Sequence, residues 1–271
     1  MLNEISIGQF FPGNSPIHRL DPRVKLVLTF AYILLIFIPD NWVGLAAAIV
    51  LLFVSVLLSR IPLKTVFKGL KPVIPLLIFT SLINIFYVDG TVLVELFWGI
   101  RITLEGVLTA VFISVRILSL IAAGSLLTYT TSPTTLTDAL ERVLSPLKVL
   151  RISVHEIAMM MTIALRFIPT LIEETDKIMS AQKARGADME SGSLLQRVRA
   201  LIPVLVPLFI SSFRRAWELA MAMECRCYHG GDGRTRMKQL HLMPRDFVAM
   251  GVMALLVAVL ILSNVFVPAT I

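Results

Sequence analysis

The chain has 271 residues, of which 56% are hydrophobic and only 16% are charged, and its mean hydropathy is +0.83. A soluble domain is about 45–50% apolar and about 25% charged, so this composition excludes disordered chains, disulfide scaffolds and ordinary cytosolic enzymes and indicates several membrane spans. The net charge of +7 fits either a nucleic-acid surface or the Lys and Arg excess of cytoplasmic loops in membrane proteins.

Five apolar segments are predicted to cross the membrane as helices. The first, residues 26–38, would form only ~20 Å of helix, which is short of a hydrocarbon core about 30 Å thick. The other predicted spans are 41–59, 73–87, 102–129 and 247–271. Residues 1–20 contain no apolar run, so we expect no cleavable signal peptide.

The distribution of positive charge predicts the orientation of these spans. The N-terminal segment and the loop 60–71 carry Lys and Arg, whereas the turns at Asp40 and Asp89 carry neither. The positive-inside rule therefore places the N-terminus and the loop in the cytoplasm. Residues 132–246 hold most of the Lys and Arg, so the net charge reflects topology, and we expect no nucleic-acid partner because no nucleic-acid-binding pattern accompanies it.

The chain is thus predicted to be an all-α, polytopic membrane protein with three regions. Residues 1–131 contain the first four spans, 132–243 form a cytoplasmic module, and 244–271 form the final span. The module contains two long helices of similar design, each apolar in its first part and amphipathic and charged in its second.

The boundaries of these two helices are marked in the sequence. Ser153, followed three residues later by Glu156, has the pattern of a capping box and predicts a helix start. That helix ends at Gly186, a typical C-terminal breaker, and Pro169 is predicted to kink it. The second long helix is predicted over residues 194–227.

Each long helix ends in a short element centred on arginine. The elements are Ala184-Arg185-Gly186 and Cys225-Arg226-Cys227, with the arginines 41 residues apart. A guanidinium can bond carboxylates or carbonyls bidentately in a partner's groove. Two similar helix ends predict two similar receptors, such as the subunits of a pseudo-symmetric dimer.

Less specific interpretations of the same residues exist. A single arginine at a helix end is often a solvated cation that the helix dipole stabilises by ~0.3–1 kcal/mol, but a matching pair favours docking. Cys225 and Cys227 with nearby histidines form a poor zinc site, because two thiols spaced C-x-C on a helix point apart. His155-Glu156 begins a metalloprotease motif, but Met159 stands where the second histidine is needed.

No Walker motif is present in the sequence, so we expect no ATP or other cofactor to bind this chain. We also find no acid–base constellation, and the chain is expected not to be an enzyme.

Arg116 lies inside the fourth predicted span, where a cation is costly. Arg116 could be a functional residue, at an interface or in gating. Alternatively its side chain reaches toward the membrane surface, or it pairs with Glu105 within the chain. The scarcity of other charges within the spans favours a scaffold over a channel.

The sequence resembles a known family of membrane proteins. Residues 164–170, Ala-Leu-Arg-Phe-Ile-Pro-Thr, followed by Ala184-Arg185-Gly186, resemble the transmembrane (T) component of energy-coupling factor transporters, which are ABC-type importers. Residues 20–26, Leu-Asp-Pro-Arg-Val-Lys-Leu, are similar to an N-terminal motif of that family. The resemblance covers nearly the whole chain, although Cys225 and Cys227 stand where the family pattern has Ala and Gly.

The resemblance implies a function. Two crossing coupling helices would each dock an arginine motif into one of two homologous ATPase subunits, with ATP bound by those subunits. The chain would be the scaffold that couples them to a small membrane substrate-binding subunit, for uptake of a vitamin or other micronutrient across a prokaryotic cell membrane. Arg166 and Pro169 of the matching motif, together with Arg116, are candidate structural or interface residues. An integral-membrane enzyme using Arg116, His155 and Glu156, or a stand-alone channel, is the alternative.

Overall fold

The computed structural model describes residues 10–95, 101–150, 153–187, 193–230 and 240–267, and the chain divides into two compact units. One unit is made of residues 8–139 and 239–271, and we call it the membrane unit. The other contains residues 140–238, and we call it the helix-pair unit.

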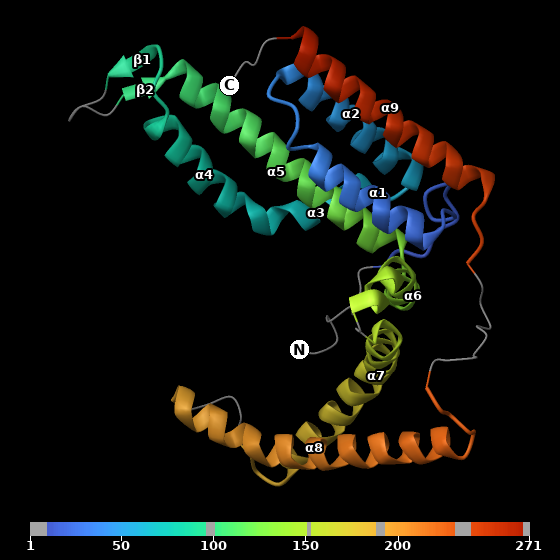
Figure 1. Cartoon of the computed structure of the whole chain (residues 1–271). Helices are drawn as coiled ribbons and strands as arrows, with labels where there is room; N and C mark the ends of the chain where they lie inside the picture. Colours follow the sequence, from blue (N-terminus) through green and yellow to red (C-terminus); the bar gives the residue numbers. More distant parts are fainter. Residues whose placement is uncertain (1–9, 96–100, 151–152, 188–192, 231–239, 268–271) are drawn as a thin grey trace. The chain divides into compact units, whose positions relative to one another are not determined.

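Helices dominate both units (Figure 1). The helices of the membrane unit are α1 (Pro22–Leu35), α2 (Trp42–Ser59), α3 (Leu63–Leu70), the short η2 (Lys71–Val73), α4 (Ile74–Tyr87), α5 (Leu104–Thr130) and α9 (Pro244–Phe266). Strands β1 (Val92–Glu95) and β2 (Arg101–Thr103) form a small antiparallel sheet before α5. Helix α6 (Pro133–Val143) crosses the division, and η3 (Ser145–Leu150), α7 (Val154–Ala184) and α8 (Leu194–Glu224) belong to the helix-pair unit.

In the described part of the chain, six helical segments are long and apolar enough to cross a membrane. They are Trp42–Ser59, Leu63–Tyr87, Leu104–Thr130, Val154–Ala184, Leu195–Glu224 and Pro244–Phe266. The predicted all-α polytopic class is therefore confirmed. Helix α1 has 14 residues and is not among the six, in keeping with the short first segment. Helices α7 and α8 qualify because their first halves are apolar, and their cytoplasmic location stays a prediction.

Three helices of the membrane unit begin at residues whose side chains cap the free backbone N–H groups. Asp21 accepts a hydrogen bond from the Arg23 N–H, and Pro22 occupies the first position of α1, where no intrahelical N–H is needed. Asn41 caps α2 and Thr103 caps α5 in the same way. These short polar side chains explain why apolar runs become helices with defined starts.

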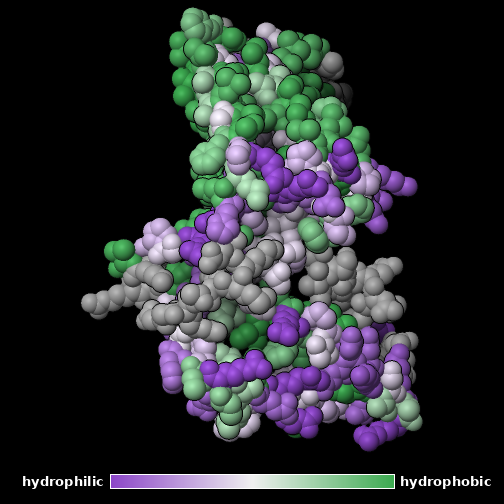
Figure 2. Space-filling view, turned by 90° about the vertical axis from the view of Figure 1, so that its right-hand side faces the viewer, coloured by the Kyte–Doolittle hydropathy of each residue, from purple (hydrophilic) through white to green (hydrophobic). Residues whose placement is uncertain are grey.

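The core of the membrane unit lies where α1, α2, α5 and α9 meet. Figure 1 shows these helices packed side by side. The buried cluster between them consists of Tyr32, Ile36, Leu45, Ala48, Phe112, Ala123, Leu256 and Leu260. In Figure 2 hydrophobic residues also dominate the visible outer face of this unit, as expected for helices surrounded by lipid rather than water.

Buried polar contacts tie the last span to the first. The Asp246 carboxylate accepts hydrogen bonds from the Asp21 N–H at 2.8 Å and the Met243 N–H at 2.7 Å. Lys25 donates to the Thr130 carbonyl at 2.9 Å, which joins α1 to the end of α5. Because a buried charge is costly unless it is hydrogen-bonded, these contacts fix the register of α1, α5 and α9.

Candidate docking site at two arginine helix ends

Helix α7 ends in a turn that holds Arg185 at its C-cap. The Gly186 N–H donates to the Lys183 carbonyl at 3.0 Å, and the Ala187 N–H donates to the Gln182 carbonyl at 3.0 Å. These two bonds, with Gly186 at a φ of 84°, form a Schellman motif, which satisfies the carbonyls that a helix end leaves free. Glycine is suited to this left-handed position because it has no Cβ.

Helix α8 ends in the same turn although its residues differ. The Cys227 N–H donates to the Glu224 carbonyl at 2.8 Å, and the Tyr228 N–H donates to the Met223 carbonyl at 3.1 Å. Cys227 occupies the place of Gly186 and adopts a φ of 54°. Arg226 therefore occupies the same position in its turn as Arg185. The weak repeat in sequence is a close repeat in backbone hydrogen bonding.

Both turns present their arginines to the outside. Arg185 is exposed with Ala184 and Gly186, and Arg226 is exposed with its two flanking cysteines. Among the described residues, neither guanidinium pairs with a carboxylate. Each site thus offers a free planar cation between small residues at the negative end of a helix dipole, where a cation is favourable.

The pairing of α7 with α8 separates the two arginines. The two helices run antiparallel and cross, as Figure 1 shows. Gln182, near the end of α7, contacts Pro203 in the first part of α8, whereas Tyr228, just beyond α8, contacts Met159 near the start of α7. Arg185 and Arg226 therefore lie toward opposite ends of the pair, which suits two receptors rather than one.

A cluster at the crossing was not predicted from the sequence. Glu174 of α7 accepts two hydrogen bonds from Arg215 of α8, at 2.7 and 3.0 Å, and a further bond from the Ser211 hydroxyl. Both bonds from Arg215 end on one carboxylate oxygen, Oε2, and the Ser211 hydroxyl donates to the other, so the two oxygens of Glu174 are both held by α8. Nothing local marks these residues among the other charges on the amphipathic halves, so only the packed pair identifies them.

A proline supplies the other contact at the crossing. Pro207 has no N–H, so the carbonyl four residues earlier, that of Pro203, has no helical donor. The Gln182 side chain donates to this carbonyl at 3.3 Å. These two prolines inside α8 thus create an acceptor for α7.

The face of α8 turned away from α7 is apolar and exposed. Val204, Ser211 and Arg215 face α7, and Val204 is only 3% exposed. The opposite side carries Val198, Ile202, Leu205, Phe209, Phe213 and Trp217, which are 52–71% exposed. An apolar stripe of this length marks an interaction surface.

The start of α7 differs from the prediction. Ser153 precedes the helix, but its side chain makes no capping hydrogen bond, so the capping box with Glu156 was a wrong prediction. The backbone of Ser153 has a ψ of 67°, outside the extended region that an N-cap residue adopts. The neighbouring His155 instead bonds Glu141 at 3.0 Å. A capping box does form at α8, between Ser193 and Gln196.

Arg166 and Pro169, which belong to the motif at residues 164–170, are both exposed on α7. Pro169 lies inside the helix, which continues to Ala184.

In the membrane unit, Arg116 donates to the Pro39 carbonyl at 2.7 Å and stacks over the Phe112 ring at 4.7 Å.

The suggested partner of Arg116, Glu105, has other contacts. Glu105 accepts hydrogen bonds from the N–H and the hydroxyl of Thr91, so the alternative in which Arg116 pairs with Glu105 is not the one that the described residues adopt. Eleven residues along one helix separate the two charges, whereas the Pro39 carbonyl at the end of a neighbouring segment lies within reach. Arg116 is therefore held within the chain by the Pro39 carbonyl, in the field of the adjacent Asp40 carboxylate.

These features define a class of protein: a polytopic membrane scaffold with a pair of crossed helices that present two arginine ends. Residues 13–239 match the family model described as CbiQ, cobalt transport protein. The chain is 52% identical over 253 residues to the energy-coupling factor transporter transmembrane protein EcfT of Ruminiclostridium cellulolyticum, covering 93% of this chain and 94% of that protein.

Other relatives carry the same description. The EcfT protein of Clostridium kluyveri is 51% identical over 267 residues, covering 98% of this chain and 99% of the relative, and that of Lactococcus lactis is 43% identical over 245 residues, covering 90% and 92%. The chain belongs to this family, the transmembrane (T) components of energy-coupling factor transporters.

Proposed function

We propose that this chain is the membrane scaffold of an energy-coupling factor importer in a prokaryotic cell membrane, and that Arg185 and Arg226 each dock one of two homologous ATPase subunits. The observation that carries the proposal is the repeated helix end, with an exposed arginine at the same position in two identical hydrogen-bonded turns. The names of the relatives support the class of transporter.

The chemistry of docking follows from the two turns. Ala184 and Gly186 at one end, and Cys225 and Cys227 at the other, are small enough to let the helix end enter a groove. A guanidinium inside that groove then meets carboxylates or carbonyls in a bidentate geometry. ATP is bound by the partner subunits, and this chain contributes no catalytic group.

Coupling is mechanical in this proposal. ATP binding brings the two ATPase subunits together and carries the arginine ends with them. The Glu174–Arg215 contact at the crossing makes α7 and α8 pivot as one body. The exposed apolar stripe of α8 faces the small membrane substrate-binding subunit and shifts it, so that its vitamin or other micronutrient is released inward.

The same proposal places the N-terminus and both arginine ends in the cytoplasm. The positive charges of loop 60–71 support this orientation. The charges in the second half of α7, among them Glu173, Glu174, Asp176 and Lys177, support an aqueous rather than a lipid environment for that half.

The test is charge reversal at both ends. The double variant Arg185→Glu, Arg226→Glu should lose uptake and should no longer co-purify the ATPase subunits in mild detergent, because each groove now meets a carboxylate. Arg199→Glu is the matched control, since Arg199 is also exposed on α8 but lies outside both turns. Normal uptake and normal ATPase association in the double variant would refute the docking proposal.

The alternatives predict different behaviour for the chain alone. An enzyme would turn over a substrate without partners, and a channel would conduct ions when reconstituted by itself, whereas the scaffold does neither. The structure gives the residues of the enzyme hypothesis separate partners: Arg116 bonds Pro39, and His155 bonds Glu141.

A further inference from the structure

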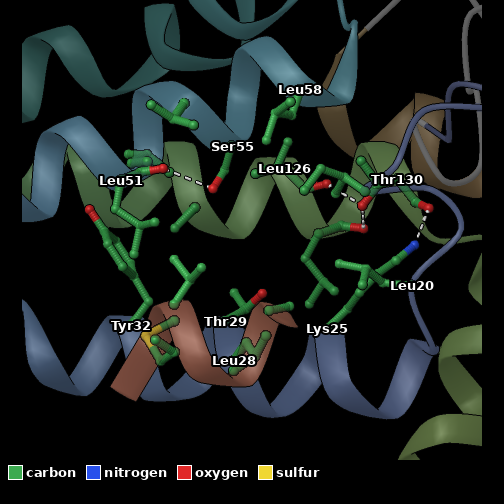
Figure 3. Close-up of a pocket in the computed structure, with 18 of the residues that line it drawn as sticks. Leu20, Lys25, Leu28, Thr29, Tyr32, Leu51, Ser55, Leu58, Leu126 and Thr130 are labelled. Carbon is green, nitrogen blue, oxygen red and sulfur yellow. Dashed lines mark hydrogen bonds between the residues drawn. The ribbon is translucent and has the colours of Figure 1, made fainter. Parts of the chain in front are cut away.

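A cavity of about 410 Å³ lies within the membrane unit between α1, α2, α5 and α9 (Figure 3). Its volume is in the range of ~300–1,000 Å³ that ligand pockets occupy. Most of its wall is aliphatic, including Leu28, Leu51, Leu58, Leu126 and Val252. All of its lining residues belong to the membrane unit, and the function proposed above does not use them.

The charged groups of the cavity gather at one end. Figure 3 shows Lys25 and Thr130 at one end and Tyr32 and Leu51 at the other. Arg245, at the start of α9, also lines the cavity. The hydrogen bond from the Asp21 N–H to Asp246 joins the starts of α1 and α9, so Arg245 belongs to the same end as Lys25.

Two cations, Lys25 and Arg245, are among the lining residues of the cavity. Lys25 is buried, donates to the carbonyls of Thr130 and His18, and lies in the field of both Asp21 and Asp246. Arg245 is exposed, and the one contact described for its guanidinium is to the Met243 sulfur at 2.9 Å, a weak acceptor. Of these two cations, Arg245 is thus the one in excess, because no carboxylate among the described residues pairs with it.

Three hydroxyls, those of Thr29, Tyr32 and Ser55, line the interior away from Lys25. The Ser55 hydroxyl already donates to the Leu51 carbonyl, and the Tyr32 hydroxyl already donates to the Ala48 carbonyl. A strongly polar ligand would therefore leave most of its own groups unpaired between aliphatic walls, which is unfavourable. A hydrocarbon chain has no such groups and fits this lining.

We propose that the cavity binds an anionic phospholipid, with one acyl chain between α1, α2, α5 and α9 and the phosphate at Arg245. A guanidinium binds phosphate oxygens bidentately, and basic pockets between membrane helices are suited to anionic headgroups. The aliphatic interior and the single excess cation at its rim match the two halves of such a lipid.

The binding test uses the full-length chain, purified in mild detergent with equal amounts of phosphatidylglycerol and phosphatidylcholine and measured by native mass spectrometry. Wild type should retain one phosphatidylglycerol, at least threefold in preference to phosphatidylcholine. Ala249→Phe, which projects a ring into the cavity, should reduce retention about tenfold. Ala254→Phe is the matched control, because Ala254 is exposed on the same helix and does not line the cavity.

Two further experiments test the proposal without a substitution inside the cavity, which could disturb folding: a surface variant and a cross-linking measurement. Arg245→Gln should abolish the preference for phosphatidylglycerol. On wild type, phosphatidylglycerol with a diazirine in its acyl chain should cross-link to residues 28–32, 51–58, 123–130 or 248–253. Equal retention by Ala249→Phe and Ala254→Phe, no headgroup preference in wild type, a retained free fatty acid instead of a phospholipid, or cross-links only elsewhere would each overturn the proposal.

Discussion

Cys227 is the residue at which the two arginine ends differ most. It occupies a left-handed backbone position that Gly186 fills in the other turn, with a φ of 54° against 84°. A residue with a Cβ pays roughly 1–2 kcal/mol for this conformation. The turn nevertheless forms with all its hydrogen bonds, so the departure from the family's Ala-Arg-Gly pattern does not alter the helix end.

Replacing Cys227 with glycine should therefore stabilise the end of α8 by about 1 kcal/mol without loss of docking. The measurement is thermal unfolding in detergent, together with co-purification of the ATPase subunits. Gly186→Ala is the reciprocal change. A Cβ at Gly186 would meet no atom within 4 Å, so its cost should come from backbone strain alone. A destabilised Cys227→Gly protein would contradict this account.

At the scale of elements, the crossing of α7 and α8 depends on Glu174. Its contacts with Arg215 and Ser211 are partly buried, and the Glu174 side chain is 18% exposed. Removing one partner of such a pair costs more than an exposed ion pair, which is worth ~0–1 kcal/mol. The contact should matter more for transmitting motion than for folding.

Glu174→Gln should accordingly lower uptake severalfold while both ATPase subunits still co-purify, because the arginine ends remain intact. The swap Glu174→Arg with Arg215→Glu should recover part of the loss. The measurements are uptake and ATPase association for each single variant and for the swap. Uptake that stays at the wild-type level in Glu174→Gln would show that the crossing contact does not transmit motion.

The bounds of α7 and α8 were predictable from local sequence, but the contact between them was not. Apolar periodicity, Gly186 and the charge distribution gave the bounds of both long helices to within a few residues. The Glu174–Arg215 contact joins residues 41 positions apart, and its existence depends on how two helices cross, which no local pattern encodes. Ser153 was misjudged because the capping pattern specifies residue types but not the backbone angles that Ser153 adopts.

At the scale of the molecule, the final span is held to the first by Asp246, a residue with no exceptional sequence signal. Its carboxylate is 1% exposed and satisfies two backbone N–H groups, those of Asp21 and Met243. The span itself was predictable from its uncharged run of residues. This contact was not, because a carboxylate at a helix start is also common on exposed surfaces.

Asp246→Ala should leave the buried Asp21 N–H without its acceptor, at about 1–3 kcal/mol, and the partly buried Met243 N–H as well, at a smaller cost. We expect a lower melting temperature in detergent and weaker protection of α1 and α9 against proteolysis. Asp246→Asn, which keeps one acceptor oxygen, should be intermediate. The exposed Asp89 offers a control, since Asp89→Ala should leave the melting temperature unchanged.

The most direct measurement of docking uses the two cysteines of the chain, Cys225 and Cys227, both exposed beside Arg226. In inside-out membrane vesicles, a membrane-impermeant maleimide should label them when the chain is expressed alone. Co-expression of the ATPase subunits should slow labelling at least tenfold, and Arg226→Glu should restore the rapid rate. Labelling that is equally fast with and without the ATPase subunits, or that occurs only from the outer face of intact cells, would contradict docking at this helix end.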